Sequence, residues 1–188
     1  MNSARDISRG LAAVDSAVYA AVATTQTPAL DRAMRHLSAA ADHSKISLAV
    51  AGLLALRPGR PRHAALRGVA AVAATSTAAN LVAKQLVQRP RPIRAAETSP
   101  GRYVPMPNSA SFPSGHTASA VAFAYAVGST LPAAIVPLGA IAFAVGYSRV
   151  HTGVHYPGDV AAGAMIGIAG AAAVSALASR WETRTRNA

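Results

Sequence analysis

Residues 103–148 read YVPMPNSASFPSGHTASAVAFAYAVGSTLPAAIVPLGAIAFAVGYS, without a single Asp, Glu, Lys or Arg. Residues 160–179 are equally free of charged side chains. Uncharged stretches of this kind can lie in the hydrocarbon of a bilayer. Of the 188 residues, 52% are hydrophobic and 13% charged, so the chain is more apolar than an ordinary soluble protein. The sequence therefore predicts a membrane-embedded protein.

The apolar segments predict an all-α transmembrane bundle, because Ala is abundant in them and alternation of polar and apolar residues is rare. We expect about five spans, at residues 46–56, 68–86, 114–131, 132–148 and 157–179. The first is short for a span of roughly 20 residues, so it either includes residues 42–45 as well or tilts little in a thin bilayer. Frequent Gly and Ala permit close helix packing, although coding bias in a GC-rich genome is an equal explanation.

The N-terminal part of the chain is less apolar. Residues 28–43 carry apolar side chains at helical spacing beside charged ones, which predicts an amphipathic helix on the bundle or in the membrane interface. We expect one domain, 1–188, with peripheral N-terminal helices at 1–43, a bundle core at 44–179 and a basic tail at 180–188. The apolar run after the first arginines is interrupted by Asp15 and does not indicate a signal peptide.

The formal net charge of +11 raises nucleic acid as a partner. The basic residues lie between apolar stretches, however, which favours anionic lipid headgroups and the membrane over nucleic acid. No obligatory protein partner is evident. The chain has no Cys, so thiol nucleophiles and Cys-based metal sites are excluded.

The distribution of basic residues predicts an orientation. Five alternating spans bring two Arg clusters, at 57–67 and 180–186, to one face, which we expect to be cytoplasmic. The opposite, extracytoplasmic face then carries further cations, which suggests that chemistry keeps them there: Lys84, Arg89, Arg91, Arg94, Arg102 and Arg149.

Three clusters share that second face, each beside the end of a predicted helix. In the first, Lys84 closes an apolar helix and Arg91 follows a turn interrupted by proline. Arg91 can give two parallel hydrogen bonds to a phosphate, and Lys84 can act as a compact charge. A basic cluster that flanks a membrane is the alternative explanation.

The second cluster, residues 111–116, opens a long apolar helix. The outward backbone N–H groups and the helix dipole favour an anion there, and Gly115 lets a phosphate approach the backbone. Helix capping by Ser114 is the simpler alternative.

The third cluster places Arg149, His151, His155 and Asp159 within twelve residues. Asp159 can accept a hydrogen bond from His155, which fixes its tautomer and raises its nucleophilicity. A zinc site made of His116, His151, His155 and Asp159 is the alternative. The surrounding cations disfavour a divalent metal and already neutralise a phosphate, so we expect no metal and no cofactor.

The three clusters resemble the signature of the type 2 phosphatidic acid phosphatase superfamily. That signature is Lys-x6-Arg-Pro, Pro-Ser-Gly-His and Ser-Arg-x5-His-x3-Asp, and it is intact at Lys84 to Pro92, Pro113 to His116 and Ser148 to Asp159. The resemblance implies a metal-free site in a helical core shared with soluble acid phosphatases and vanadate-dependent haloperoxidases. The haloperoxidases are larger and soluble, so their activity is not expected.

Carried over residue by residue, the resemblance implies catalytic roles. His155 becomes the nucleophile, Asp159 orients it, and His116 protonates the departing oxygen and later activates water. Phosphate-binding groups would be Lys84, Arg91, Ser114, Gly115 and Arg149. His151 and Arg89 lie outside the signature, and His151 is expected to line the pocket as a polar residue. Arg94 and Arg102 are expected either to contact the headgroup or to lie in a solvated loop.

The expected activity is that of an integral-membrane lipid phosphate phosphatase. The candidate substrates are polyprenyl and glycerolipid phosphates or diphosphates, all of which present a terminal phosphate. The length and composition are similar to actinobacterial members of the family, some of which act on decaprenyl-phosphate sugars. A lipid phosphotransferase and a membrane protein that binds anions without reacting remain alternatives.

Overall fold

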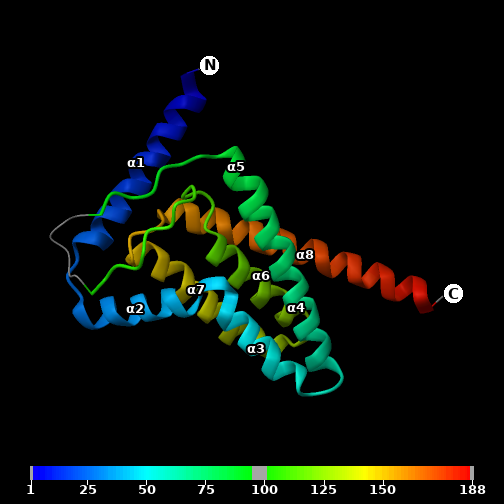
Figure 1. Ribbon diagram of the computed structural model, residues 1–188. Helices are drawn as coiled ribbons and strands as arrows, with labels where there is room; N and C mark the ends of the chain where they lie inside the picture. The colour runs from blue at the N-terminus through cyan, green and yellow to red at the C-terminus, as the bar shows by residue number, and fades with distance from the viewer. Residues whose placement is uncertain (1, 95–100, 187–188) are drawn as a thin grey trace.

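The computed structural model describes residues 2–94 and 101–186, and these residues form helices and loops without strands (Figure 1). The elements along the chain are α1 (Asn2–Thr24), α2 (Pro28–Ala40), a 3-10 turn (Asp42–Ser44), α3 (Lys45–Ala55), α4 (Arg60–Thr77), a π-helical turn (Ala78–Ala83), α5 (Lys84–Leu86), α6 (Gly115–Thr130), a 3-10 turn (Pro132–Ala134), α7 (Ile135–His151) and α8 (Pro157–Arg186).

Helix α6 is the centre of the bundle and packs against α4, α7 and α8. Short connections reverse the chain between α3 and α4, between α6 and α7, and between α7 and α8. Arg60 Nη2 donates to Thr130 O at 2.8 Å and so joins the start of α4 to the end of α6. The helices α3, α4, α6, α7 and α8 thus alternate in direction, in the order expected from the sequence.

Close packing of α8 on α6 depends on small residues. A Cβ on Gly163 would lie 2.5 Å from Ser114 O, and one on Gly167 would lie 2.6 Å from Ala118 O. Distances this short are impossible for a real Cβ, so the two glycines let the helix backbones touch. The abundance of small residues therefore has a packing function at this contact.

Several helix boundaries differ from the prediction. Helix α4 starts at Arg60 and not at residue 68, because Gly59 turns the chain at φ +80° and Pro61 suits the first helical turn. The segment predicted as a basic tail continues α8 to Arg186, since no proline or glycine follows Gly170 to end the helix. Residues 187–188 of that segment lie outside the described residues.

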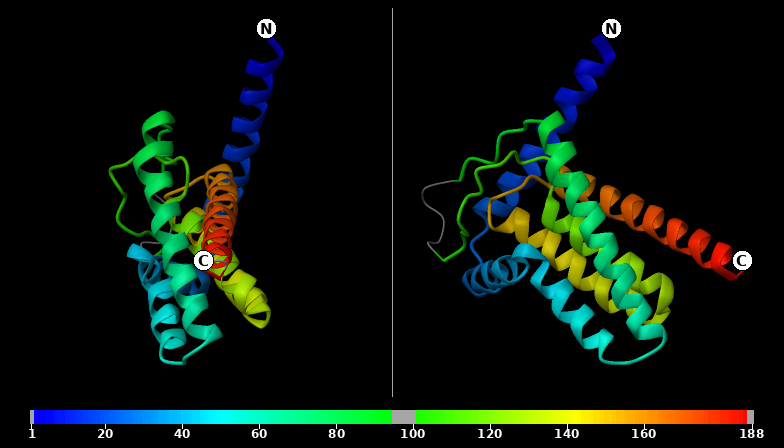
Figure 2. Two further views of the ribbon diagram at one scale, coloured as in Figure 1. Left: turned by 90° about the vertical axis from the view of Figure 1, so that its right-hand side faces the viewer. Right: turned by 45° about the vertical axis from the view of Figure 1, so that its right-hand side comes forward.

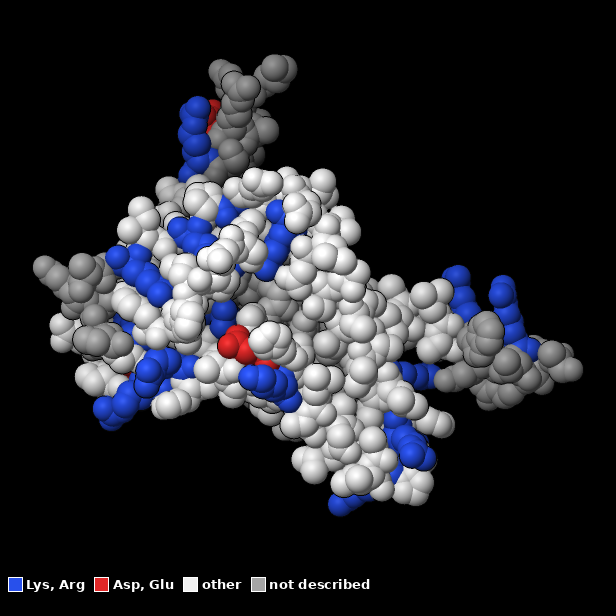
Figure 3. All heavy atoms as spheres, in the orientation of Figure 1, with Lys and Arg blue, Asp and Glu red and all other residues white. Residues whose placement is uncertain are grey.

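Three helical segments are long and apolar enough to cross a membrane: Arg60–Leu86, Pro132–His151 and Pro157–Arg180. Helix α3, with 11 residues, and α6, with 16, are shorter. Lys and Arg gather over one part of the surface and again at the α3–α4 turn and the far end of α8, with a mostly uncharged surface between them (Figure 3). This is the charge pattern of a multi-pass membrane protein.

The N-terminal helices α1 and α2 contact the bundle mainly at the end where the segment between α5 and α6 lies. The first part of α1 and the second part of α8 project from it (Figure 2). Buried Arg102 donates through Nε to Asp31 Oδ1 at 2.9 Å and through Nη1 to Ala23 O at 2.7 Å. Asp31 also bonds His151 Nε2 at 2.8 Å, so one buried carboxylate links α2, α7 and the loop that holds Arg102.

Candidate active site

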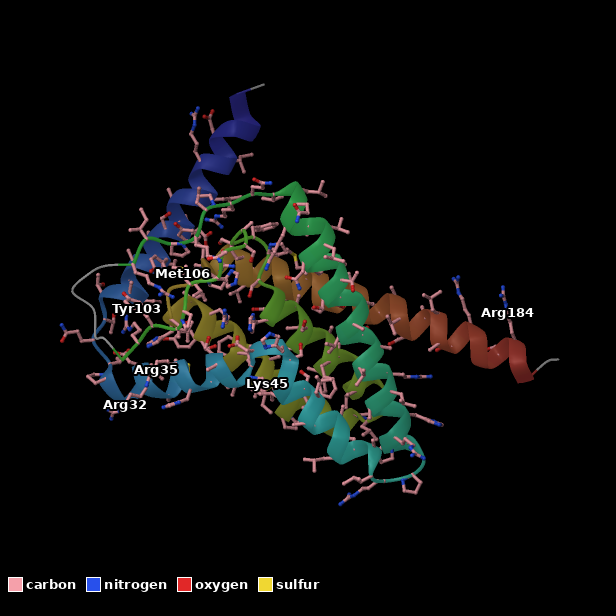
Figure 4. All side chains as sticks on the ribbon, in the orientation of Figure 1. Arg32, Arg35, Lys45, Tyr103, Met106 and Arg184 are labelled. Atoms are coloured by element: carbon pink, nitrogen blue, oxygen red, sulfur yellow. The ribbon has the colours of Figure 1, made fainter. Side chains whose placement is uncertain are left out.

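A cavity of about 460 Å³ lies at the end of the bundle where α5 ends, α6 begins and α7 ends. The loop of residues 104–109 and the turn between α2 and α3 complete its wall. Figure 4 shows Tyr103 and Met106 on the segment between α5 and α6, Lys45 at the start of α3, and Arg184 at the far end of α8. Six predicted site residues line the cavity: Lys84, Arg91, Gly115, His116, Arg149 and His155.

His155 lies between the cavity and Asp159 and is only 2% exposed. Gly153, at φ +68°, turns the chain between the end of α7 and this histidine. His155 Nε2 lies 3.4 Å from Arg91 Nη1, and Nδ1 lies 3.5 Å from Asp159 Oδ2. Among the described residues, no atom makes a hydrogen bond of ordinary geometry to Nδ1. The distance to Asp159 is long for a hydrogen bond, so the contact is electrostatic.

The carboxylate of Asp159 is fixed from several sides. Arg89 Nη1 donates to Oδ1 at 3.0 Å, and Tyr156 N donates to Oδ2 at 2.9 Å. The hydroxyl of Ser111 also donates to Oδ2. Asp159 is fully buried behind His155 and does not line the cavity. It is therefore placed to orient the imidazole and not to contact a substrate.

The charge state of His155 follows from its surroundings. Burial and the positive charges of Arg91 and Arg149 lower the pKa of His155 to about 4, although Asp159 acts in the opposite direction. The imidazole is therefore neutral at physiological pH. A neutral ring keeps a free lone pair on one nitrogen, which is what a nucleophile requires.

Three cations meet at the cavity, with different numbers of unused donors. Lys84 Nζ donates to Ser109 Oγ at 3.2 Å. Arg149 donates through Nη1 to Ser38 Oγ at 2.6 Å, and its buried Nε has no partner. Arg91 is different, because Nε, Nη1 and Nη2 already donate to loop oxygens of Ser109, Ala110 and Val154. The two parallel hydrogen bonds predicted from Arg91 to a phosphate would compete with these contacts.

The start of α6 reaches the cavity through Gly115. A Cβ on Gly115 would lie 3.1 Å from Asn80 Oδ1, so a side chain there would crowd the end of the π-helical turn. Ser114 is buried and does not line the cavity. Its hydroxyl accepts from Thr117 Oγ1 at 2.9 Å, and its N–H donates to Asp159 O at 2.9 Å. Its contacts position the start of α6.

His116 faces the cavity one residue further along α6. Its Nε2 lies 2.7 Å from Asp42 Oδ1. The side chain of Asp42 is 45% exposed, and the same oxygen lies 3.9 Å from Arg149 Nη1. The cavity thus contains a second pair of imidazole and carboxylate, more open than the pair of His155 and Asp159.

The sequence interpretation missed several of these residues. Arg89 lies outside the motifs, yet it forms ion pairs with Asp159 and, at 2.6 Å, with Asp15 Oδ2. Its guanidinium also lies 4.1 Å from the ring centre of Tyr156. Asp42 lies far from every motif in sequence. Asp15 and Arg89 are far apart in sequence and no motif links them, so only the folded structure reveals their contact.

Two expectations for residues near the cavity were wrong. Arg102 neither contacts a headgroup nor lies in solvent, because it is buried among α1, α2 and Asp31. His151 does not line the cavity, because its ring points to Asp31. Arg94 is half-buried and binds backbone oxygens of Val104 and Thr152, so it holds the cavity loop to the turn before His155.

The donor set also bears on the zinc alternative. With His151 turned to Asp31, the four side chains considered for zinc do not converge. Among the residues that the structure describes, no three His, Cys, Asp or Glu side chains form a group that could hold a metal ion.

Comparison with known proteins gives the family. The family model of the PAP2 superfamily matches residues 65–182, which is more than half of the chain. The chain belongs to the PAP2 superfamily. The matched residues include all three motif clusters, from Lys84 to Asp159.

PAP2 relatives with known names are similar over most of their length. Decaprenylphosphoryl-5-phosphoribose phosphatase of Mycobacterium tuberculosis is 36% identical over 165 residues, which cover 85% of each chain. The protein of that name from Mycolicibacterium smegmatis is 38% identical over 164 residues, covering 84% of this chain and 83% of its own.

Solved PAP2 structures share the fold. The transmembrane PAP2 type phosphatidylglycerolphosphate phosphatase of Bacillus subtilis superposes with a TM-score of 0.71 at 24% identity, over 91% of this chain and 87% of the other. LpxE of Aquifex aeolicus gives 0.67 at 24% identity, over 84% and 92%. The expected fold class, a membrane helical bundle of the PAP2 type, is thus confirmed.

Proposed function

We propose that this PAP2 phosphatase removes the terminal phosphate from a polyprenyl-linked sugar phosphate, through a phosphohistidine on His155. The observation that carries the proposal is the position of His155 between a carboxylate and a cavity lined by cations. Its Nδ1 faces Asp159, and its Nε2 is the nitrogen near Arg91. A neutral imidazole held in this way is suited to attack phosphorus.

The reaction has two steps. In the first, His155 Nε2 forms a bond to phosphorus as the bond from phosphorus to the ester oxygen breaks, and His116 gives a proton to that oxygen. In the second, water attacks the phosphohistidine with His116 as base, which releases inorganic phosphate and restores His155. Asp159 stabilises the positive ring that forms in the first step.

The cations bind the nonbridging oxygens of the phosphoryl group. Lys84 and Arg149 both line the cavity, so they bind oxygens directly. Arg91 acts mainly through its charge, because its nitrogens are bonded to the loops. The N–H groups at the start of α6, at Gly115, add the helix dipole. Ser114 contributes by positioning that helix start.

The choice of a sugar phosphate rests on the named relatives. The named relatives at 36–38% identity act on decaprenylphosphoryl-5-phosphoribose, according to their names. A narrow apolar crevice also begins at His116 and continues along α3, lined by Ile46, Val50, Phe123 and Leu138. The crevice has a volume of only about 20 Å³, so it forms an apolar wall beside His116 and does not distinguish one lipid from another.

We further propose that the cavity opens on the extracytoplasmic face and that all five alternating helices cross the bilayer. The exposed basic residues at the α3–α4 turn then lie in the cytoplasm. The absence of Cys makes a direct test possible. Single cysteines at Asn108, beside the cavity, and Arg62, at the opposite end, are labelled in intact cells with an impermeant maleimide. The expected result is labelling at 108 only; the reverse contradicts this orientation.

The decisive experiment measures phosphate released by purified enzyme, with chelator present, from a panel of lipids. The panel contains a polyprenyl-phosphoryl ribose 5-phosphate, a polyprenyl diphosphate, phosphatidic acid and phosphatidylglycerol phosphate. The sugar phosphate is expected to give the highest kcat/KM, and the His155→Ala variant none. A dependence on added metal, or a phosphorylated alcohol in place of free phosphate, contradicts the proposal.

A further inference from the structure

Asp42 is the feature of the cavity that phosphate binding does not explain. It is the only acidic side chain among the described residues that line this cavity, and Lys84, Arg91 and Arg149 line it as well. A carboxylate repels a phosphate, so its presence here opposes binding of the group to be transferred. Its position in the cavity therefore needs another reason.

The contact with His116 identifies the part of the substrate that Asp42 meets. Asp42 Oδ1 lies 2.7 Å from His116 Nε2, inside the cavity. To receive a proton from His116, the ester oxygen has to approach the ring that Asp42 contacts, so it comes to a place near Asp42. The carboxylate is then adjacent to the leaving group and not to the transferred phosphoryl group.

The local backbone keeps Asp42 at this place. It begins the short turn between α2 and α3, in which His43 and Ser44 have φ of 55° and 57°. Both values lie in the left-handed region, which is unfavourable for residues other than glycine. The apolar crevice starts at the same turn, with Ala41 and Ser44 in its wall. The residues on either side of Asp42 thus form the edge of an apolar wall beside the cavity that Asp42 itself lines.

We propose that Asp42 is a specificity-determining residue that selects the leaving group. When substrate displaces it from His116, its carboxylate accepts a hydrogen bond from a hydroxyl group of the leaving alcohol. Its negative charge also rejects a leaving group whose departing oxygen belongs to a phosphate, as in a polyprenyl diphosphate, more strongly than one whose phosphate lies across a sugar ring from that oxygen. This inference rests on the proposed function and adds a choice of monophosphate esters of hydroxylated alcohols over diphosphates.

The experiment compares two substrates with the same short prenyl chain in the same detergent, a prenyl-phosphoryl ribose 5-phosphate and a prenyl diphosphate. The variant Asp42→Asn keeps the shape of the side chain and removes its charge. The ratio of kcat/KM for the diphosphate to that for the sugar phosphate is expected to rise about tenfold or more. The variant Asp42→Glu, which restores the charge, is expected to keep the wild-type ratio.

Asp6→Asn is the matched control, because Asp6 is an exposed acid on the projecting part of α1. It is expected to change neither rate. An equal loss on both substrates in Asp42→Asn means that Asp42 only positions His116, and it overturns the inference. The proposed function fails separately, when the wild-type enzyme releases no phosphate from the sugar phosphate. If Asp42→Asn does not fold, Asp42→Glu still tests the inference. Its charge is retained, so a change in its ratio of kcat/KM for the two substrates contradicts selection by charge.

Discussion

The two imidazoles of the cavity are held very differently. His155 is buried, and the carboxylate behind it is fixed by Arg89, Ser111 and Tyr156. His116 has one carboxylate partner, Asp42, whose side chain is 45% exposed. The nucleophile side is thus organised before substrate binds, while the leaving-group side has a partner that substrate can displace.

This difference follows from what each side has to do. The transferred phosphoryl group is the same in every substrate, so a rigid site for it lowers the cost of reaching the transition state. The leaving group varies between lipids, so the groups around it decide specificity. The comparison predicts that changes on the two sides affect activity in distinguishable ways.

The largest effect is expected for His155→Gln. Without the nucleophile, activity should fall by at least about 1,000-fold, and by the same factor on an alkyl phosphate and on p-nitrophenyl phosphate. The second readout is an acid-labile phosphoenzyme, trapped by rapid quenching with radiolabelled substrate, which should disappear. A phosphoenzyme that persists in this variant would place the nucleophile elsewhere.

A smaller effect that depends on the leaving group is expected for His116→Gln. The rate on an alkyl phosphate should fall by about 100-fold or more, because the departing oxygen lacks a proton donor. The rate of phosphoenzyme formation from p-nitrophenyl phosphate should fall much less, since nitrophenolate leaves without protonation. Equal losses on the two substrates would remove the assigned distinction between the two sides.

Arg89→Gln tests how much the nucleophile side depends on its support. Loss of the ion pairs with Asp159 and Asp15 should lower kcat by about tenfold, with little change in KM, because Asp159 is less well oriented. Arg89→Lys should restore part of the rate. The control is Arg62→Gln in the first turn of α4, at the end of the bundle away from the cavity, where no change in kcat is expected. A change in KM alone would indicate direct substrate contact.

The pH profile provides a further test. The pKa of His155 is held at about 4, below its ordinary value of 6.5, so the acid limb of kcat/KM should fall only below about pH 4. The stability of the folded protein should also decrease as the pH falls. Between pH 6.5 and 4 the unfolded chain binds a proton that the folded chain does not, so the free energy of unfolding decreases as pH falls. The substrate's own phosphate titrates at about pH 6, so its ionisation is measured separately; an acid limb near pH 6.5 that the substrate does not account for contradicts the burial argument.

The smallest effect concerns the shared scaffold behind both sides. Gly167→Ala places a Cβ against Ala118 O on α6 and should lower stability by about 1–3 kcal/mol. Thermal unfolding in detergent measures it. Gly139→Ala is the matched control, because a Cβ there meets no atom within 4 Å. Similar melting temperatures for the two variants would show that α8 can shift away from α6.

Much of the fold was predictable because hydrophobicity and small-residue content act locally. The uncharged runs predicted both ends of α6 and α7, and the start of α8, to within a few residues. The C-terminal end of α8 was predicted too early. Helix α4 was predicted too short, since its first turn is basic and only the turn at Gly59 reveals where it begins. Helix α3 was recognised as short, and its 11 residues bear this out.

For the candidate site, the sequence by itself determined the residues that belong to contiguous motifs, from Lys84 to Asp159, because their spacing is written along the chain. Only the tertiary structure decided that Arg91 is occupied by loop oxygens, that Arg102 and His151 turn to Asp31, and that Asp42 meets His116. Those contacts join side chains that are tens of residues apart. Their partners depend on how α2, α6 and α7 pack, and packing is a property of the folded chain and not of any one segment.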